Sequence, residues 1–355
     1  MENIGVISIG IKLPIVTQGD NLRKIIVDYV TNSSKINDRD IIGIIESIVA
    51  RCEGNYVTVD DIALETERIF GKDAIIQVVC PIYSRNRFSI ILKGIAKSCK
   101  GIIMKCPAID EVGNPWGVNP WTGVNIKDYY REIVESENCI YSEIGEKSNL
   151  FLDWLNNRKW LICNLHNVDD IKKSYKYGTT ATLADYFSDK CEYGLLGSNK
   201  ANDNVLKLFP SKHYSEELIY GVKNDIFHRT GKTIEVMIYG DGCFKDPDSG
   251  IWEFADPVAS PAYTEGLKGS PNEIKLKAFA DGKYKYLHGN VLEKAIKDEI
   301  ANKKDNLTGK MEAQGTTPRR YVNLLASLMD LTSGSGDKGT PVVLVKNYFK
   351  NFADA

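Results

Sequence analysis

The stretch Asp40-Ile-Ile-Gly-Ile-Ile-Glu-Ser-Ile-Val-Ala-Arg51 decides how this chain folds. Residues 41–45 are continuously apolar, which is typical of a strand buried on both faces of a sheet. The polar residues Glu46 and Ser47 follow where that strand ends. Functional side chains are often placed at such junctions, because the scaffold sets their geometry while the adjoining loop stays accessible. We therefore expect a core strand here, with a candidate site at its end.

Segments near both ends of the chain are predicted to complete this core. Residues 3–16 are mostly β-branched and predict a buried strand. A turn then supplies Asp20 as the N-cap of a helix. The apolar face of that helix follows the helical period and comprises Leu22, Ile25, Ile26, Tyr29 and Val30. Further on, Thr317 and Pro318 open a helix that precedes a closing strand at residues 341–345.

A strand at residues 232–239 leads into a strongly acidic segment. Five carboxylates lie within sixteen residues, at Asp241, Asp246, Asp248, Glu253 and Asp256. Carboxylate oxygens suit Mg²⁺ or Mn²⁺, which are often shared with substrate phosphates. Asp246 and Asp248 flank a proline, which favours a turn-forming role for them. Asp241 is the candidate metal ligand, because it directly follows the strand.

The expected architecture is α+β. A mixed core of sheet and helices is predicted from residues 1–99 and 194–355, and residues 100–193 predict an inserted, smaller α+β subdomain. A length of 355 residues agrees with about two domains. A loop rich in Gly, Pro and Trp occupies residues 113–123. Its tryptophans either pin the loop to the core or line a pocket.

Composition excludes several classes of partner and location. The net charge of −2 and the pI near 6.2 give no electrostatic case for nucleic acid or an anionic membrane. No apolar stretch approaches the ~18 residues of a spanning helix. Glu2, Lys12 and Pro14 do not suit a signal peptide. A cytoplasmic protein is therefore expected.

Several known catalytic and metal-binding motifs do not occur. The eight cysteines include no C-x-x-C pair, and the four histidines include no H-E-x-x-H. There is no G-x-S-x-G, and no G-x-G-x-x-G follows a strand with an acidic residue ~20 positions on, which argues against a hydrolase and a Rossmann dehydrogenase. Thr230-Gly-Lys-Thr233 resembles the end of a P-loop, but Ile226 stands where that motif needs glycine.

Four segments, taken in order, resemble the γ-glutamyl ligases of coenzyme F-420 biosynthesis. The first is Leu13-Pro-Ile-Val-Thr-Gln-Gly-Asp20, and the second is the quoted strand continued to Gly54. The third runs from Thr230-Gly-Lys to Asp241-Gly-Cys-Phe244. The fourth is Asn323-Leu-Leu-Ala-Ser-Leu-Met329, followed by a glycine-rich loop and Pro-Val-Val-Leu-Val345. Their order and spacing carry the resemblance more than any one segment does.

The resemblance implies a GTP-dependent ligase that joins L-glutamate to a phosphodiester-linked deazaflavin by an amide bond. It also implies two divalent ions, Mg²⁺ or Mn²⁺, and a homodimer. The implied metal positions are Asp241 and Asn199. The implied nucleotide contacts are Leu13, Pro14, Ile15, Val16, Glu46, Ser47, Arg51, Asn202, Ser333, Gly334, Ser335 and Gly336. No catalytic residue is assigned, and the expected partners are small molecules, with no nucleic acid and no membrane.

Three departures from the family pattern bear on the activity. Asn199 stands where a metal-binding aspartate is implied, unless Asp203 supplies that carboxylate. Arg51 replaces a phosphate-facing lysine, and Thr332 or Ser333 replaces an acidic ligand. A neutral amide weakens a cation site because it contributes no negative charge. Two alternatives stay open: a nucleotide-binding member that has lost ligase activity, and a ligase for a different carboxylate substrate.

Overall fold

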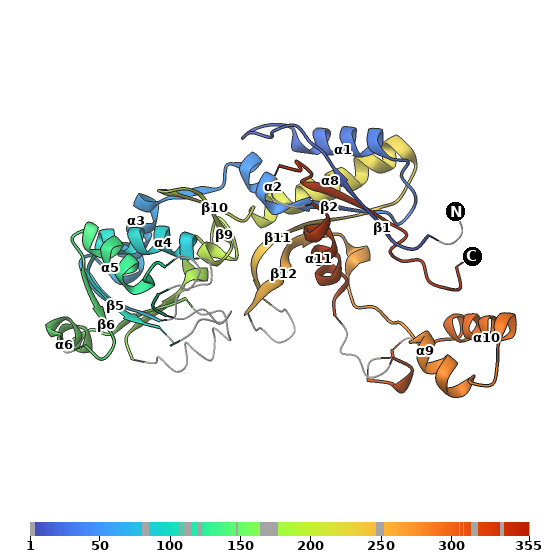
Figure 1. Cartoon of the computed structure of the whole chain (residues 1–355). Coiled ribbons are helices and arrows are strands. Elements are labelled where there is room, and N and C mark those ends of the chain that lie inside the picture. The colour runs from blue at the N-terminus through green and yellow to red at the C-terminus, as the bar shows by residue number, and fades with distance from the viewer. Residues whose placement is uncertain are drawn as a thin grey trace.

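The computed structural model shows a molecule with two main lobes (Figure 1). It describes residues 4–79, 85–106, 108, 116–118, 123–146, 148–163, 177–245, 252–304, 306–307, 309–313, 319–333 and 337–354. For residues 85, 86, 241–245 and 252–259 it describes the backbone and not the side chains. Each lobe has its own five-stranded sheet, and a three-stranded sheet connects the lobes. Helices combine with parallel and antiparallel strand pairs, so the expected α+β architecture is confirmed.

The sheet of the first lobe has the strand order β1-β13-β2-β11-β12. These strands are β1 (Ile7–Ile11), β13 (Val342–Lys346), β2 (Ile41–Ile45), β11 (Glu235–Lys245) and β12 (Trp252–Tyr263). β2 is parallel to β11, and the remaining pairs are antiparallel. β2 lies at the centre of the sheet, as its unbroken apolar sequence predicts. The strands nearest the two chain ends, β1 and β13, lie side by side.

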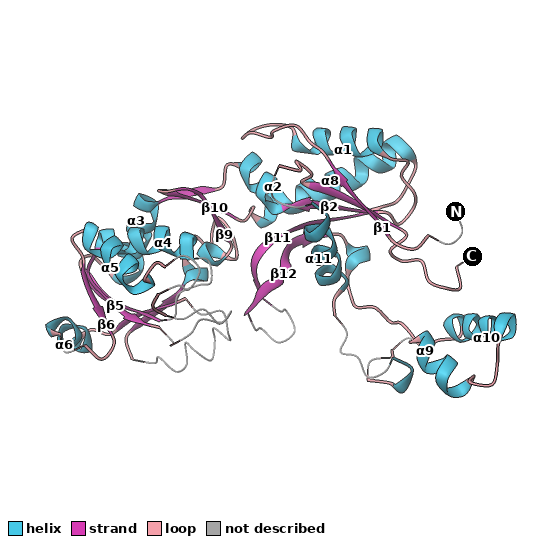
Figure 2. Ribbon diagram, viewed as in Figure 1, coloured by secondary structure: helices cyan, strands magenta, loops and turns pink. Residues whose placement is uncertain are grey.

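Helices cover both faces of this sheet (Figure 2). α1 (Leu22–Ser33) and α8 (Lys212–Thr230) pack together on one face, against Ile42 and Ile44 of β2. α11 (Tyr321–Ser333) packs on the other face, which holds Ile41. Successive strand residues point to opposite faces, so Gly43 also faces α11. A Cβ at Gly43 would lie 2.1 Å from Met329 Sδ, and this close approach requires glycine.

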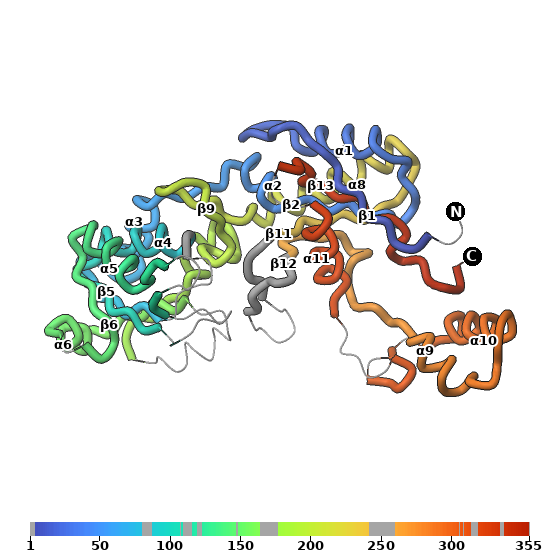
Figure 3. The backbone as a smooth tube through the Cα atoms, viewed as in Figure 1, coloured from blue at the N-terminus to red at the C-terminus, as the bar shows by residue number. Residues whose placement is uncertain are grey.

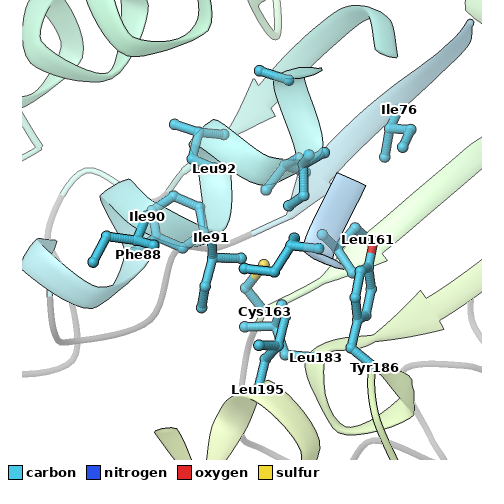
Figure 4. Close-up of a cluster of buried hydrophobic side chains, with 14 of the residues drawn as sticks. Ile76, Phe88, Ile90, Ile91, Leu92, Leu161, Cys163, Leu183, Tyr186 and Leu195 are labelled. Carbon is cyan, nitrogen blue, oxygen red and sulfur yellow. The ribbon is translucent and has the colours of Figure 1, made fainter. Parts of the chain in front are cut away.

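The second lobe contains a sheet in which every pairing is parallel. Its order is β6-β5-β4-β7-β8, formed by β4 (Ala74–Val79), β5 (Cys99–Lys105), β6 (Ile140–Glu143), β7 (Lys159–Ile162) and β8 (Thr179–Thr182). This is the order of a doubly wound α/β sheet. One face packs against α3 (Val59–Phe70), α4 (Arg85–Ser98) and α5 (Ile126–Ser136), and the other against α6 (Asn149–Asn156). Figure 4 shows the larger of these cores, where Cys163 lies among side chains of α4 and Leu195.

A small antiparallel sheet connects the lobes. It has the order β3-β10-β9, with β3 (Tyr56–Thr58), β9 (Ser198–Asn202) and β10 (Val205–Leu208). The chain enters the second lobe through β3 and leaves it through β9 and β10 (Figure 3). β10 also contacts α2 (Glu46–Glu53), the helix that follows the central strand of the first lobe. This sheet therefore brings residues of the second lobe to the end of β2.

A helical extension projects from the first lobe (Figure 1). It comprises α9 (Leu276–Ala278), the π-helix Phe279–Lys283 and α10 (Gly289–Ala301). Phe279, Ile296 and Ile300 form its small core. In the described part of the chain, the other elements are single 3₁₀ turns at Leu183–Asp185, Gly194–Leu196, Glu265–Leu267 and Met311–Ala313.

Several predicted elements differ in detail from the structure. The predicted buried strand at residues 3–16 is the short strand β1 at the sheet edge, where most of its residues are partly exposed. The predicted N-cap Asp20 is wrong, because Asn21 caps α1 and Asp20 instead accepts hydrogen bonds from Thr17. Tyr29 is 42% exposed, and the buried face of α1 consists of Leu22, Ile26, Val27 and Val30. Thr317 and Pro318 lie outside the described residues.

The second lobe begins earlier in the chain than residue 100. Its central strand β4 and the helices α3 and α4 all precede that position. The division into a core of residues 1–99 and 194–355 and a subdomain of residues 100–193 stays a prediction. Of the predicted loop at 113–123, Trp116 packs against the core of the second lobe. Within the described part of the chain, we find no helix long and apolar enough to cross a membrane.

Candidate functional site

Four segments meet at one edge of the first sheet. β2 ends at Ile45, beside Tyr239 of β11. On the other side of β2, strand β13 begins at Val342, which lies opposite Ile44. The next strand, β1, ends at Ile11, which also lies opposite Val342. The segments that adjoin these strand ends therefore lie close together. They are residues 12–16, 46–47 and 339–341, and they include most of the segments that the sequence resemblance singled out. Residues 240–241 lie beside them but do not follow a strand end as expected, because β11 continues past the end of β2 to Lys245.

Backbone hydrogen bonds hold the N-terminal turn and the C-terminal loop together. Leu13 N donates to Gly339 O at 3.2 Å, and Ile45 N donates to Pro341 O at 3.0 Å. The Thr340 hydroxyl donates to Ser333 O at 2.6 Å. The residues predicted near a nucleotide at 13–16 and at 333 therefore adjoin the start of α2. Gly334, Ser335 and Gly336 lie outside the described residues.

The side chains of these two segments differ in exposure. Ile15 is 84% exposed, Leu13 and Pro14 are also accessible, and Val16 is buried. Ser333 is buried, and its hydroxyl donates to the carbonyl of Asp330. Pro14 and Ile15 can therefore contact a bound molecule, whereas Val16 and the Ser333 side chain contribute to packing.

Glu46 is a buried carboxylate at this edge. It is the first residue of α2, and its side chain is 3% exposed. A Cβ at Gly240 would lie 2.3 Å from Glu46 Cγ, so only glycine allows β11 to approach this side chain. Asn199 Nδ2 donates to Glu46 Oε1 at 2.6 Å. An ionised carboxylate only accepts hydrogen bonds, which fixes the orientation of the Asn199 amide.

Lys207 completes this cluster. It lies on β10, directly opposite Asn199 on β9, and its ammonium donates to the hydroxyl of Ser47. Burial lowers the pKa of Lys207, and the carboxylate of Glu46 opposes that shift. The cation of Arg51 also lowers it. Glu46, Ser47, Asn199 and Lys207 thus form one polar cluster between the lobes, which we call the junction cluster.

The sequence pattern does not mark Lys207 as a site residue. It lies between Leu206 and Leu208, which are buried in the core of the second lobe. Alternation along a strand then predicts that the lysine faces solvent. The face that carries Lys207 is covered by α2, an element that precedes it by about 150 residues. The packing of α2 against β10 would have been the necessary signal.

Other predicted residues lie apart from the junction cluster. Arg51 is exposed on the last turn of α2. Asn202 is exposed at the turn between β9 and β10, where its side chain accepts from Asn204 N. Asp203 is exposed in the same turn and pairs with Lys200 at 2.7 Å. Asp203 is therefore not the missing carboxylate beside Asn199.

The junction cluster does not fit a divalent ion at Asn199. The amide presents its N–H group to Glu46, and the ammonium of Lys207 adds a positive charge to the same cluster. Both features disfavour a cation there. Across the described residues, no group of three or more His, Cys, Asp or Glu side chains could hold a metal ion. The side chain of Asp241 lies outside the described residues, as do Asp246 and Asp248 entirely.

A family model described as F420-0:Gamma-glutamyl ligase matches residues 10–347. That span includes both lobes and every segment that meets at the sheet edge. No curated protein matches the chain.

Proposed function

The chain belongs to the F420-0:Gamma-glutamyl ligase family, and from this premise we propose that it uses GTP to join L-glutamate to a carboxylate acceptor. The observation that supports a nucleotide at the sheet edge is the contact between Leu13 and Gly339 beside the start of α2. Three segments far apart in the sequence converge there on one accessible edge. Pro14 and Ile15 line it with exposed side chains.

The proposed reaction has two steps. The γ-phosphoryl group moves from GTP to an oxygen of the acceptor carboxylate, which forms an acyl phosphate and releases GDP. The amine nitrogen of glutamate then attacks the acyl carbon, an amide bond forms, and phosphate leaves with the electron pair of the broken C–O bond. The proton lost by the amine passes to solvent. Phosphoryl transfer of this kind depends mainly on positioning and on neutralising negative charge.

The family resemblance also leads us to propose Mg²⁺ or Mn²⁺ and a homodimer. A divalent ion would supply charge neutralisation for the phosphates. Asp241 stays the proposed ligand, since it follows Gly240 at the sheet edge. Asn199 does not fit that role. The acceptor is a carboxylate, and the deazaflavin phosphodiester is the first candidate to test.

The neutral side chain of Asn199 favours one alternative function. A member of the family that binds nucleotide without ligating would keep the sheet edge and lose the charge needed for phosphoryl transfer. Such a protein would bind GTP and release no phosphate when glutamate and acceptor are added.

The test is a ligation assay with purified protein, GTP, Mn²⁺ or Mg²⁺, labelled glutamate and the deazaflavin phosphodiester. We expect phosphate release that needs both glutamate and acceptor, with label appearing in the acceptor. Release without label transfer to this acceptor would point to a different carboxylate. GTP binding without any release would support the non-ligating alternative, and absence of GTP binding would contradict the proposal.

A further inference from the structure

Lys207 is an unusual residue for its position in the fold. Its neighbours Leu206 and Leu208 enter the core of the second lobe, so Lys207 points to the opposite side of β10. There it meets the first turn of α2 and donates to Ser47. A lysine normally keeps its ammonium in water, because removing the charge from water costs free energy.

The contacts of Lys207 do not offset this cost. An ammonium has three N–H donors, and Ser47 provides a neutral acceptor for one of them. Among the described residues, Lys207 forms no ion pair within 4.0 Å. Glu46 is close enough to favour the charged form, yet Arg51 and burial act against it. A half-buried cation with these neighbours is better explained by a bound anion than by stability.

The charges around Lys207 define the kind of anion. The junction cluster contains one carboxylate, Glu46, whose Oε1 already accepts from Asn199. Asn199, opposite Lys207, is neutral. The start of α2 also has no side-chain cap, and its helix dipole favours negative charge. A compact ammonium in this setting suits phosphate oxygens, for which lysine is a common ligand.

We propose that Lys207 binds phosphate oxygens of the nucleotide and takes, beside Asn199, the charge-neutralising role that a carboxylate with a divalent ion would otherwise have there. This proposal rests on the proposed function, because it assumes that a polyphosphate occupies the sheet edge. The ammonium of Lys207 would supply the positive charge on the side of the site where Asn199 and Glu46 do not fit a metal ion. The hydroxyl of Ser47 positions the ammonium until the anion arrives.

The test measures anion binding by calorimetry with two probes, tripolyphosphate and GTP, each in the presence and absence of Mn²⁺. The variants are Lys207→Met and Lys207→Arg. Lys200→Met is the matched control, because Lys200 lies on the adjacent strand, is exposed and pairs with Asp203. We expect Lys207→Met to weaken both probes about tenfold or more, as loss of a charge-assisted hydrogen bond does. Lys207→Arg and Lys200→Met should bind nearly as the parent does.

The outcomes separate this proposal from the proposed function. Equal binding of GTP by Lys207→Met and Lys200→Met overturns the role of Lys207 and leaves the ligase proposal standing. Binding of tripolyphosphate through Lys207 without binding of GTP supports the anion site and overturns the nucleotide-dependent ligase. Binding of neither probe by the parent overturns both. If Lys207→Met fails to fold, Lys207→Gln gives the same test with a polar side chain.

Discussion

The side-chain amide of Asn199 donates a hydrogen bond of 2.6 Å to the carboxylate of Glu46, 153 positions earlier in the chain. This bond joins the sheet that connects the lobes to the end of the central strand β2. The family resemblance implies an aspartate at position 199, and two facing carboxylates would repel each other unless a cation lay between them. The amide at this position avoids that repulsion and supplies Glu46 with a hydrogen-bond donor instead.

The first prediction follows from this contact. Asn199→Asp should lower the free energy of unfolding by roughly 1–3 kcal/mol at neutral pH, because it places a second carboxylate against buried Glu46. The loss should shrink at acidic pH, where the new carboxyl group is protonated. Urea unfolding checks both effects. Asn202→Asp is the control, since Asn202 is exposed and its oxygen only accepts from a backbone N–H.

The same variant tests metal binding. If two carboxylates can hold a cation at this position, Mn²⁺ should raise the melting temperature of Asn199→Asp more than that of the parent. The ammonium of Lys207 should reduce this gain, so the double variant with Lys207→Met should respond most strongly. Equal responses of all three proteins to Mn²⁺ would show that no cation binds at position 199.

A second prediction concerns pH. Burial lowers the pKa of Lys207 from the ordinary 10.5, and the cation of Arg51 adds to this shift. The carboxylate of Glu46 opposes the shift. Tyr56 lies opposite Lys207 on β3 and is a further neighbour with an ionisable group. The ammonium is present below the lowered pKa and is lost as the pH rises through it. GTP affinity should therefore fall in the alkaline range at a lower pH than for an ordinary lysine. Lys207→Arg should abolish this fall, because arginine stays charged. Parallel titration curves for the two proteins would contradict the role of Lys207.

A third prediction concerns Gly240. Gly240→Ala would place a Cβ 2.3 Å from Glu46 Cγ, so the Glu46 side chain or β11 must move. We expect a loss of about 1–3 kcal/mol in the free energy of unfolding, together with weaker GTP binding. Gly282→Ala is the matched control, because nothing lies within 4 Å of its Cβ. Unchanged stability of Gly240→Ala would mean that Glu46 is not held against the strand.

A fourth prediction concerns assembly. β12 is the last strand of the first sheet, so one of its edges has no strand partner within the described part of the chain. Such an edge is a ready site for pairing with another chain, and two-fold dimers are the commonest soluble assembly. Light scattering at micromolar concentration should therefore give about twice the chain mass of 39.7 kDa. A monomer that unfolds cooperatively would contradict the expected homodimer.

The sequence by itself determined the central strand and the place where it ends. Residues 41–45 carry no charge, as a strand buried on both faces requires, and the polar pair Glu46 and Ser47 marks where this strand gives way to α2. The segments at residues 13–16 and 339–341 were also identifiable, since each adjoins a strand with a clear apolar pattern, whereas β11 continues through residues 240–241 to Lys245. These features depend on neighbours in the chain, which the sequence contains directly.

The tertiary structure decided the junction cluster and the second lobe. Alternation along β10 predicts an exposed Lys207, and only the packing of α2 over that face leaves it half-buried. Likewise, nothing local indicates that Asn199 meets Glu46 or that β4 is the central strand of a parallel sheet. Parallel pairings and contacts between lobes join residues far apart in the chain, and their partners are chosen by the packing of whole faces rather than by local periodicity.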